Sequence, residues 1–339
     1  MKAAIFAYSK QGCATARRVA GLLPGGTLRR FTVARLEQPD FDAIPRPGRA
    51  FYGEQFCWAE VLIFVGSCGL AVREIAPHLK DKQTDPAVLV IDELGRFTIP
   101  LLSGHIGGAN ALARELAEKL ESTPVITTAT DINGRFSADA WAAQKGYVIG
   151  SIKTAKAVSA AVLEGDVPLS SDFAVAPSLP KGLILGEGGK IGIYVGYQTK
   201  KPFDQTLQLL PPVLHIGIGC RKGASAQAIA DAVAHVLAQH QLDRRAVASV
   251  ASIDLKAEEP GLKEFARQNG WRLHCYSPEQ LMALEGAYTA SPFVQKIAGV
   301  DTVCERAAMM GADFLIVKKT AMNGVTVAVA AEKMEVSFG

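Results

Sequence analysis

The sequence has no long apolar run, although 49% of its 339 residues are hydrophobic. A helix that crosses a membrane needs about 18 or more consecutive apolar residues, and no window approaches that length. The start of the chain, MKAAIFAYSKQG, holds one short apolar run and then turns polar, so it lacks the longer apolar core of a secretory signal. With 20% charged residues the composition is that of a globular protein, and we expect it to be cytoplasmic with no membrane partner.

Closely spaced cysteines and runs of basic residues are also missing. The six cysteines include no CxxC pair, which argues against a zinc site and a disulfide framework, so we expect no metal site. The formal net charge is only +3, and the lysines and arginines form no long run. This argues against a nucleic-acid partner. A small basic excess still suits an anionic small molecule.

Apolar β-branched runs alternate with stretches of helical spacing through residues 1–131. Such alternation predicts a mostly parallel sheet with helices on its faces. The short turn DELG at residues 92–95 leaves no room for a crossover, so we expect one antiparallel hairpin there. The expected strands are residues 3–8, 61–65, 87–91, 97–101 and 125–128, and the expected helices lie near residues 15–23, 70–80 and 110–120.

The same alternation returns after the double proline Pro211-Pro212, which we take as a domain boundary. The predicted fold class is therefore α/β, in three parts. Residues 1–131 form a mostly parallel N-terminal α/β domain, residues 132–212 a small α+β middle insert, and residues 213–339 a C-terminal α/β domain. Expected helices in the later parts are residues 138–145, 154–163, 225–240, 260–269 and 302–310, and expected strands are residues 213–219, 247–252, 272–276, 314–317 and 325–330.

The segment SGHIGGAN, residues 103–110, places a hydroxyl, an imidazole, an amide and three glycines at a helix N-terminus. Backbone N–H groups at such a position bind anions. His105 is either a proton shuttle, since imidazole titrates near pH 6.5, or a side chain that ties down the loop. Ser103 is either a nucleophile or a helix cap. The residues expected to line a substrate here are Gly104, Gly107, Gly108 and Asn110.

Two further candidates lie close to this loop in the sequence. Asp131 ends the segment PVITTATD, at the carboxyl edge where open α/β sheets bind ligands, and is a candidate base. Arg73 follows GSCGL and either holds a substrate carboxylate or is an exposed helix residue. Asp92 and Glu93, which end a strand and open a turn, either serve the conformation of that turn or have a catalytic role.

The segment GIGCRKGAS, residues 217–225, invites comparison with nucleotide-binding loops. Both common motifs require glycine at position 222, where the chain has Lys222. What remains is either an anion cradle, made by Gly219, Arg221, Lys222 and the helix cap Ser225, or a structural turn with solvated charges. Further on, Glu305 either pairs with a base such as Arg306 or Lys296 or contacts substrate, while Cys304 is expected in the core.

Three segments, residues 79–117, 217–225 and 291–308, resemble the cobalt-precorrin-5A hydrolase family of anaerobic cobalamin biosynthesis. The resemblance covers roughly residues 50–131 and 213–331. It implies a cobalt corrinoid substrate whose ring-A δ-lactone is opened by water, with release of acetaldehyde to give cobalt-precorrin-5B. It implies no cofactor, because the substrate carries the cobalt and the macrocycle serves as the electron sink.

From the positions of the motifs we assign His105 or Asp131 as the base, the N–H groups of residues 103–110 as oxyanion donors, and Arg73, Arg221 and Lys222 as carboxylate anchors. The two glycine-rich loops are then expected to border one cleft. Two other classes stay open: a non-catalytic tetrapyrrole-binding or chaperone protein, and a nucleotide-binding oxidoreductase, which Lys222 disfavours. The expected partners are the corrinoid, neighbouring enzymes of the cobalamin pathway and a second copy of the chain in a homodimer.

Overall fold

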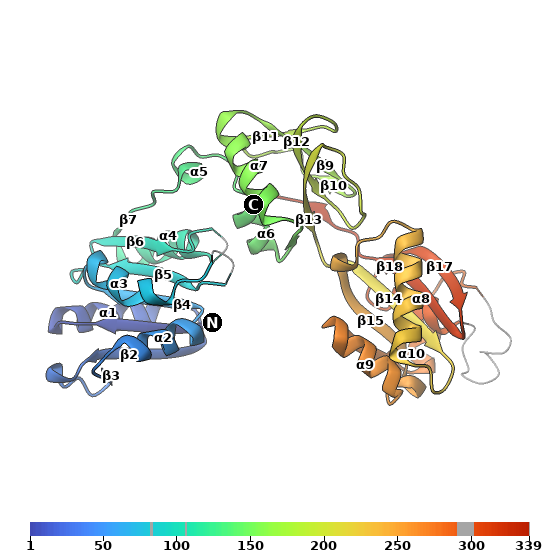
Figure 1. Ribbon diagram of the computed structural model, residues 1–339, viewed down its shortest axis with the longest axis horizontal. Coiled ribbons are helices and arrows are strands. Elements are labelled where there is room, and N and C mark those ends of the chain that lie inside the picture. The colour runs from blue at the N-terminus through green and yellow to red at the C-terminus, as the bar shows by residue number, and fades with distance from the viewer. Residues whose placement is uncertain (82–83, 106, 290–301, 339) are drawn as a thin grey trace. The chain divides into compact units, whose positions relative to one another are not determined.

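A computed structural model describes residues 1–81, 84–105, 107–289 and 302–338. The chain divides into two compact units, Met1–Gln144 and Lys145–Gly339 (Figure 1). Both units are built from sheets and helices, which confirms the α/β class. Two separate five-stranded sheets share the second unit, and the finer division into three domains stays a prediction.

The first unit contains one seven-stranded sheet in the order β3-β2-β1-β4-β5-β6-β7. Strands β1 to β5 run parallel, and the predicted hairpin is confirmed because β6 pairs antiparallel with β5. All five residues of β4 and of β5 are buried, as expected for strands covered on both faces. The strands are β1 Lys2–Ala7, β2 Thr27–Val33, β3 Asp42–Ile44, β4 Val61–Val65, β5 Ala87–Ile91, β6 Phe97–Leu102 and β7 Thr123–Pro124.

Helices cover both faces of this sheet. Helices α1 (Lys10–Leu22) and α4 (Ala109–Leu120) pack on one face through small and aliphatic side chains. Helices α2 (Arg49–Trp58) and α3 (Cys68–Ile75) pack on the other face, in a cluster rich in aromatic rings. Two short helices follow β7, α5 (Ala129–Ile132) and α6 (Ala138–Lys145), and short 3-10 turns lie at Ala34–Leu36 and Ala76–His78.

The first sheet of the second unit has the order β11-β9-β12-β13-β8 and packs against α7 (Ile152–Glu164). Its strands are β8 Val148–Ile149, β9 Val167–Ser171, β11 Leu183–Leu185, β12 Ile191–Val195 and β13 Gln205–Leu210. Beside it, β10 (Ala174–Val175) pairs in parallel with β19 (Glu335–Val336). The end of the chain therefore returns to the middle region, where the side chain of Val336 is fully buried.

The second sheet has the order β16-β15-β14-β18-β17, with the first three strands parallel and the last two antiparallel to their neighbours. Helices α8 (Ala226–Gln239) and α9 (Pro260–Asn269) cover one face, and α12 (Val303–Met309) covers the other. The remaining elements are β14 Leu214–Cys220, β15 Val247–Ile253, β16 Arg272–Tyr276, β17 Phe314–Met322, β18 Val325–Ala331, α10 Pro278–Met282 and the 3-10 turns Arg244–Ala246 and Asp254–Lys256.

One predicted strand is wrong. Residues 125–128 are not extended in the sheet, because the chain leaves it after Val125, whose N–H donates to the Thr98 carbonyl at 2.9 Å. The following residues lead into α5 instead. Within the described ranges, no helix has both the length and the apolar character needed to cross a membrane.

Candidate active site

The residues of the loop between β6 and α4 pack closely against one another. Ser103 has a φ of +55°, and its hydroxyl donates to the Asp85 carbonyl at 2.9 Å. A Cβ on Gly107 would lie 2.4 Å from the Ser103 Cβ, and a Cβ on Gly104 would lie 2.6 Å from the side-chain oxygen of buried Asn110. Packing alone therefore requires glycine at both positions.

Several N–H groups of this loop are already bonded. Those of Gly108, Ala109 and Asn110 donate to the carbonyls of His105, Ser103 and Gly104 at 3.0, 3.2 and 2.9 Å. Gly108 has a φ of +78° and supplies no side-chain cap to α4. In this conformation these three N–H groups are not available to an oxyanion, and the predicted substrate contacts of Gly104, Gly107, Gly108 and Asn110 stay predictions.

His105 and Asp131, the two alternative bases, are hydrogen-bonded to each other. The His105 Nε2 atom lies 3.0 Å from Asp131 Oδ2 and 3.2 Å from the Thr130 hydroxyl. On the other side of the ring, Nδ1 lies 3.3 Å from Asp139 Oδ1 and 3.2 Å from the Ser137 hydroxyl. The imidazole is thus held between two carboxylates, with 20% of its side chain exposed.

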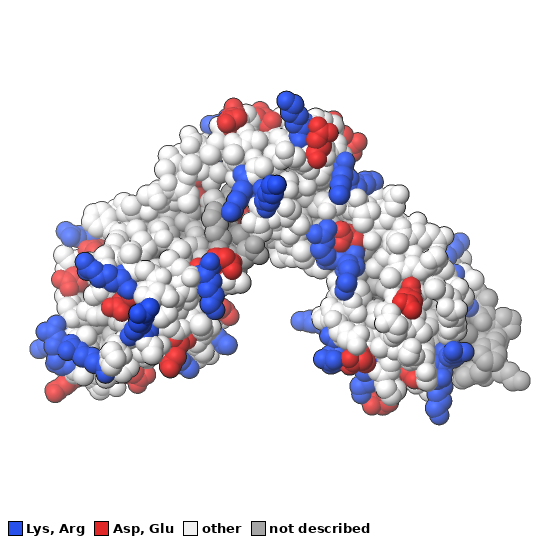
Figure 2. Space-filling view, in the orientation of Figure 1, with Lys and Arg blue, Asp and Glu red and all other residues white. Residues whose placement is uncertain are grey.

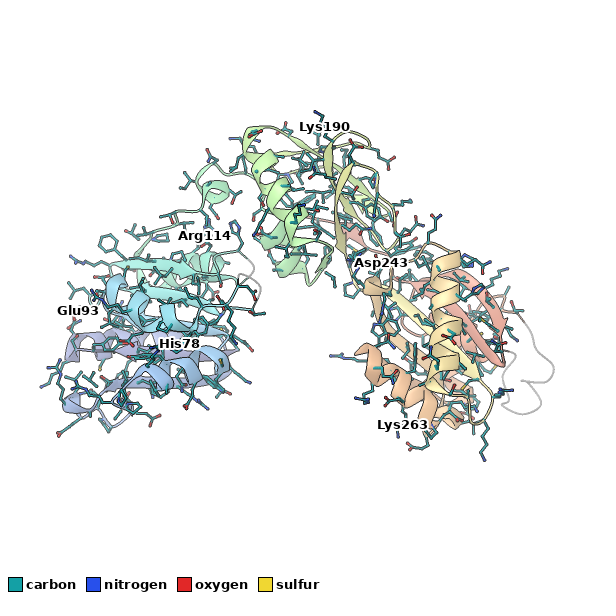
Figure 3. The ribbon with its side chains drawn as sticks, viewed as in Figure 1. His78, Glu93, Arg114, Lys190, Asp243 and Lys263 are labelled. Carbon is teal, nitrogen blue, oxygen red and sulfur yellow. The ribbon has the colours of Figure 1, made fainter. Side chains whose placement is uncertain are left out.

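Asp131 lies on α5 and not, as expected, at the end of a strand. Its carboxylate accepts hydrogen bonds from the Asn110 amide at 3.0 Å, from the Thr128 hydroxyl and from the Arg114 guanidinium. Arg114 projects from α4 with 51% of its side chain exposed (Figure 3). The buried amide of Asn110 therefore helps to hold the carboxylate that binds His105.

These contacts separate the pKa values of the three titratable groups. The hydrogen bond to Asp139 raises the pKa of His105 above its usual value, against the lowering effect of burial, and Asp131 adds to the increase. Burial by itself raises the pKa of Asp131, but hydrogen bonds from Arg114, Thr128 and His105 outweigh it and give a pKa of about 2. Asp139 also reaches a pKa of about 2, because its bonds to His105 and Ser137 outweigh burial. The site therefore favours an imidazolium between two ionised carboxylates.

Ser103 takes no part in this cluster. Its hydroxyl is bound to Asp85, and the described residues bring no base within hydrogen-bonding distance of it. The nucleophilic role of Ser103 therefore stays a prediction without structural support. Its positive φ and its bond to the Asp85 carbonyl fit the competing interpretation, a residue that shapes the turn.

The second glycine-rich loop joins β14 to α8. Ser225 caps α8, since its hydroxyl accepts from the Ala228 N–H at 3.1 Å. The N–H groups of Arg221 and Gly223 donate to the Gly324 carbonyl and to the Glu259 carboxylate. Gly219 is packed closely, because a Cβ there would lie 2.5 Å from the Thr326 hydroxyl.

The cations predicted to anchor carboxylates are on the surface. The side chains of Arg221 and Lys222 are exposed, and Arg73 is exposed in the last turn of α3. Within the described part of the chain, none of the three forms an ion pair. On the face that Figure 2 shows, lysine and arginine side chains of each unit are interspersed with acidic ones. Binding of substrate by these three residues stays a prediction.

Glu305 is enclosed by the protein itself, with 1% of the residue exposed. Its carboxylate accepts from the N–H and hydroxyl of Thr289, at 2.6 and 2.7 Å, and from the Lys319 N–H at 2.6 Å. Arg306 instead donates to the carbonyls of Leu281 and Leu284, and Lys296 lies outside the described residues. These bonds support a structural role, and substrate contact by Glu305 stays a prediction.

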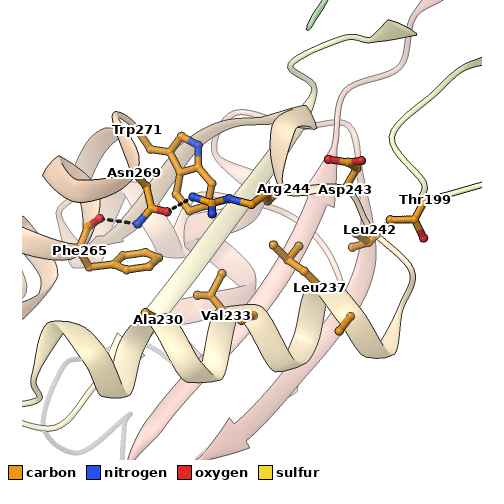
Figure 4. A pocket seen from close by; sticks show the side chains of 12 residues that line it. Thr199, Ala230, Val233, Leu237, Leu242, Asp243, Arg244, Phe265, Asn269 and Trp271 are labelled. Atoms are coloured by element: carbon orange, nitrogen blue, oxygen red, sulfur yellow. Dashed lines mark hydrogen bonds between the residues drawn. The ribbon is translucent and has the colours of Figure 1, made fainter. Parts of the chain in front are cut away.

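A groove of about 440 Å³ in the second unit contains none of the predicted site residues (Figure 4). Its walls are side chains of α8 and α9 and the ring of Trp271. Arg244 closes one side, donating to the Asn269 side-chain oxygen at 2.7 Å with its guanidinium 5.8 Å from the Trp271 ring. The groove is mainly apolar, and it lies at the opposite end of α8 from residues 217–225. Among the described residues no group of three histidine, cysteine or acidic side chains is placed to hold a metal ion.

Comparison with known proteins gives consistent matches over most of the chain. Residues 50–131 match the family described as Cobalamin synthesis G N-terminal, and residues 214–330 match Cobalamin synthesis G C-terminus. The chain is 36% identical over 292 residues to the cobalt-precorrin-5A hydrolase of Priestia megaterium, covering 79% of this chain and 78% of the relative. It is 33% identical over 323 residues to that of Salmonella typhimurium, covering 91% of each.

Two solved structures are similar to a lesser degree. A cobalamin biosynthesis protein G homolog from Sulfolobus solfataricus is 22% identical with a TM-score of 0.41, covering 98% of this chain and 97% of that one. CobE, a protein of the cobalamin biosynthetic pathway, is 30% identical with a TM-score of 0.34, covering 36% of this chain and 93% of that one. The sequence identities to the hydrolases are the stronger of these similarities.

Proposed function

This chain belongs to the cobalt-precorrin-5A hydrolase family, and we propose that it catalyses that reaction with His105 as the group that moves protons. Water opens the lactone between the ring-A acetate and carbon C20 of the corrinoid. The products of this step are the free acetate and a C20 hydroxyl. The C20 hydroxyl then loses its proton. The carbon–carbon bond between C20 and the macrocycle breaks, its electron pair stays on the macrocycle, and acetaldehyde leaves. The remaining corrinoid is cobalt-precorrin-5B.

The hydrogen bond between His105 and Asp131 is the observation that supports this role most directly. Lactone hydrolysis requires a group that gives a proton to the departing C20 oxygen and takes up the proton that the attacking water loses, and a single imidazolium performs both steps in that order. A carboxylate with a pKa of about 2 is a poor base near neutral pH, so Asp131 is better suited to holding His105 than to activating water. His105 lies within the segment that matches the N-terminal family.

Arg114 supplies a second element that the reaction needs. Opening of the lactone creates a carboxylate, and a guanidinium binds carboxylates through several N–H donors in one plane. Arg114 uses one nitrogen on Asp131 while half of its side chain is exposed. We therefore expect the new ring-A acetate to bind beside Arg114, close to the imidazole.

Turnover of cobalt-precorrin-5A with trapping of acetaldehyde tests this assignment. His105→Ala or Asp131→Asn is expected to lower turnover by about 10² or more, as loss of a general base or of its partner typically does. His235→Gln, an exposed histidine on α8, is the matched control and is expected to keep the normal rate. Near-normal turnover in both site variants, each shown to be folded by circular dichroism, would mean that the proton carrier lies elsewhere.

A non-catalytic tetrapyrrole-binding or chaperone role is not favoured, because the relatives are named hydrolases. Such a protein would bind the corrinoid without release of acetaldehyde, so the same assay separates the two. Gly217 no longer argues for a nucleotide-binding loop. A Cβ on Gly217 would lie 1.8 Å from the Cys304 carbonyl oxygen, so packing alone requires glycine at this position. A cytoplasmic location, the lack of a cofactor, a homodimer and association with neighbouring pathway enzymes stay predictions.

A further inference from the structure

We propose that Asp139 positions His105 for this reaction by binding the Nδ1 side of its ring, which directs Nε2 toward Asp131 and the reacting proton. The proposal rests on the function proposed above and adds a residue to it. Asp139 lies on α6, outside the segment that matches the N-terminal family, and nothing in its sequence surroundings marks it as part of a site.

The carboxylate of Asp139 is fixed by hydrogen bonds from groups other than the imidazole. Its Oδ1 atom accepts from the Ser137 hydroxyl at 2.7 Å and from the Ala140 N–H at 3.0 Å, and it lies 3.3 Å from His105 Nδ1. Only 19% of the side chain is exposed, which is close to the 20% of His105. A carboxylate fixed by two donors gives the imidazole a defined orientation.

Ser137 places a second oxygen on the Nδ1 side of the ring. A hydroxyl has one hydrogen, and Ser137 donates it to Asp139. The Ser137 oxygen, 3.2 Å from Nδ1, therefore acts as an acceptor toward the ring. Both ring nitrogens therefore face acceptors, Nδ1 the Asp139 carboxylate and the Ser137 oxygen, and Nε2 the Asp131 carboxylate at 3.0 Å, so the contacts favour an N–H on each side of the ring.

The two carboxylates have different surroundings. Asp131 forms an ion pair with the Arg114 guanidinium and also accepts hydrogen bonds from Asn110 and Thr128. The hydrogen bonds to Asp139 come from His105, Ser137 and Ala140. The groups facing the imidazole are therefore Asp131 on α5 and Asp139 on α6, with Arg114 of α4 behind Asp131. Consistent with this, Asp139 is the larger cause of the raised pKa of His105.

This arrangement predicts two linked roles for the ring. While Asp131 and Asp139 keep it charged, His105 donates its Nε2 proton to the departing C20 oxygen. Once that proton has left, Nδ1–H remains bound to Asp139 and Ser137, and Nε2 takes up the proton that the attacking water loses. Asp139 touches neither water nor substrate in this scheme, so it is a positioning residue.

The test is Asp139→Asn, with Asp139→Glu as the conservative variant. An asparagine removes the negative charge beside Nδ1 and loosens the orientation of the ring, so kcat is expected to fall by about 10² or more with little change in KM. The pKa of His105, followed by NMR, is expected to fall, and the limb of the pH–rate profile that follows His105 is expected to move to lower pH with it. Asp139→Glu is expected to recover part of both effects, and Ser137→Ala to cost a few-fold, about the loss of one hydrogen bond.

Asp40→Asn serves as the control for net charge. Asp40 pairs with Arg17 and Arg30 elsewhere in the first unit, so this variant is expected to leave both the rate and the His105 titration unchanged. A His105 pKa that does not move in a folded Asp139→Asn protein would overturn the positioning role, even if His105 itself proves essential. Conversely, full turnover by His105→Ala would refute the proposed proton carrier, while the NMR titration would still report whether Asp139 holds the ring.

Discussion

Each polar side chain around His105 has several bonded partners, and this fixes its protonation. Asp131 accepts from an imidazole, an amide, a hydroxyl and a guanidinium, so its ionised form is stabilised far more than its neutral form. The imidazole lies between two carboxylates, which stabilise its charged form. Folding and protonation are therefore linked at this site.

The linkage predicts how Asp131→Asn depends on pH. The pKa of Asp131 is about 2 in the folded protein and about 3.9 in an unfolded chain, so its contribution is complete above pH 4 and is lost as the pH falls through 2. The variant is therefore expected to lose about 1 kcal/mol of unfolding free energy at pH 7 and little at pH 2. Urea unfolding at both pH values measures this, with exposed Asp42→Asn as the control. An equal loss at both pH values would assign the effect to shape and not to charge.

His105 and Asp131 could be chosen from the sequence, each for a separate reason, and the structure places them 3.0 Å apart. Asp139, Ser137 and Arg114 could not be chosen in this way. The contacts of Asp139 and Ser137 with the imidazole, and of Arg114 with Asp131, depend on the path of residues 129–139, which have no hydrophobic periodicity and form two short helices joined by turns. Arg114 is an ordinary exposed helix residue until α5 brings Asp131 to it.

At the scale of elements, the packing of α12 against β14 is unusually close. The backbone of α12 approaches Gly217 so closely that a Cβ there would lie 1.8 Å from the Cys304 oxygen and 2.6 Å from the Ala308 nitrogen. Small side chains at Ala308, Ala328 and Ala330 allow the same approach along the strand pair. This contact explains the first glycine of the segment GIGCRKGAS without any ligand.

Gly217→Ala is therefore expected to destabilise the second unit by about 3 kcal/mol, or to prevent its folding. The clash is with helix backbone, which cannot move without displacing α12, so the cost exceeds that of an ordinary overpacked side chain. Gly21→Ala on α1 is the control, because its Cβ meets nothing within 4 Å and alanine favours a helix. Thermal unfolding of both variants checks this, and an unchanged melting temperature for Gly217→Ala would contradict the close packing.

Periodicity predicted the buried elements well and the edge elements poorly. Strands β4 and β5 are continuous apolar runs, and α9 has the predicted bounds. The sequence pattern did not reveal β2, because its first four residues, TLRR, are either polar or exposed. This strand lies beside the short edge strand β3. Nor did it reveal α2, in which Tyr52, Gln55 and Phe56 are buried without a clear apolar stripe.

At the scale of the whole molecule, the two glycine-rich loops belong to different units, yet the reaction has a single large anionic substrate. We expect Arg221→Ala with Lys222→Ala to weaken corrinoid binding by about 1 to 3 kcal/mol through lost charge-assisted hydrogen bonds, with little change in kcat. Titration of the protein with substrate measures the affinity. The effect is expected to shrink for macrocycles with amidated side chains, which carry less charge.

A surface pair in the same unit provides the matched control. Lys263 pairs with Glu258 at 2.8 Å on an exposed face, so Lys263→Ala removes a cation without touching residues 217–225. Equal affinity in the double variant and in this control would assign GIGCRKGAS to a structural turn. Weakened binding together with normal chemistry would assign Arg221 and Lys222 to substrate binding and not to the chemical steps.

The return of β19 to β10 has a consequence for synthesis. On the ribosome, residues 174–175 emerge long before residues 335–336, and the entire second five-stranded sheet is made in between. Until then Lys145 lacks its contact with Ser337, at 3.3 Å in the finished protein, and the edge at β10 is open to other strands. The β10–β19 pair is therefore among the last contacts of the second unit that can form during synthesis.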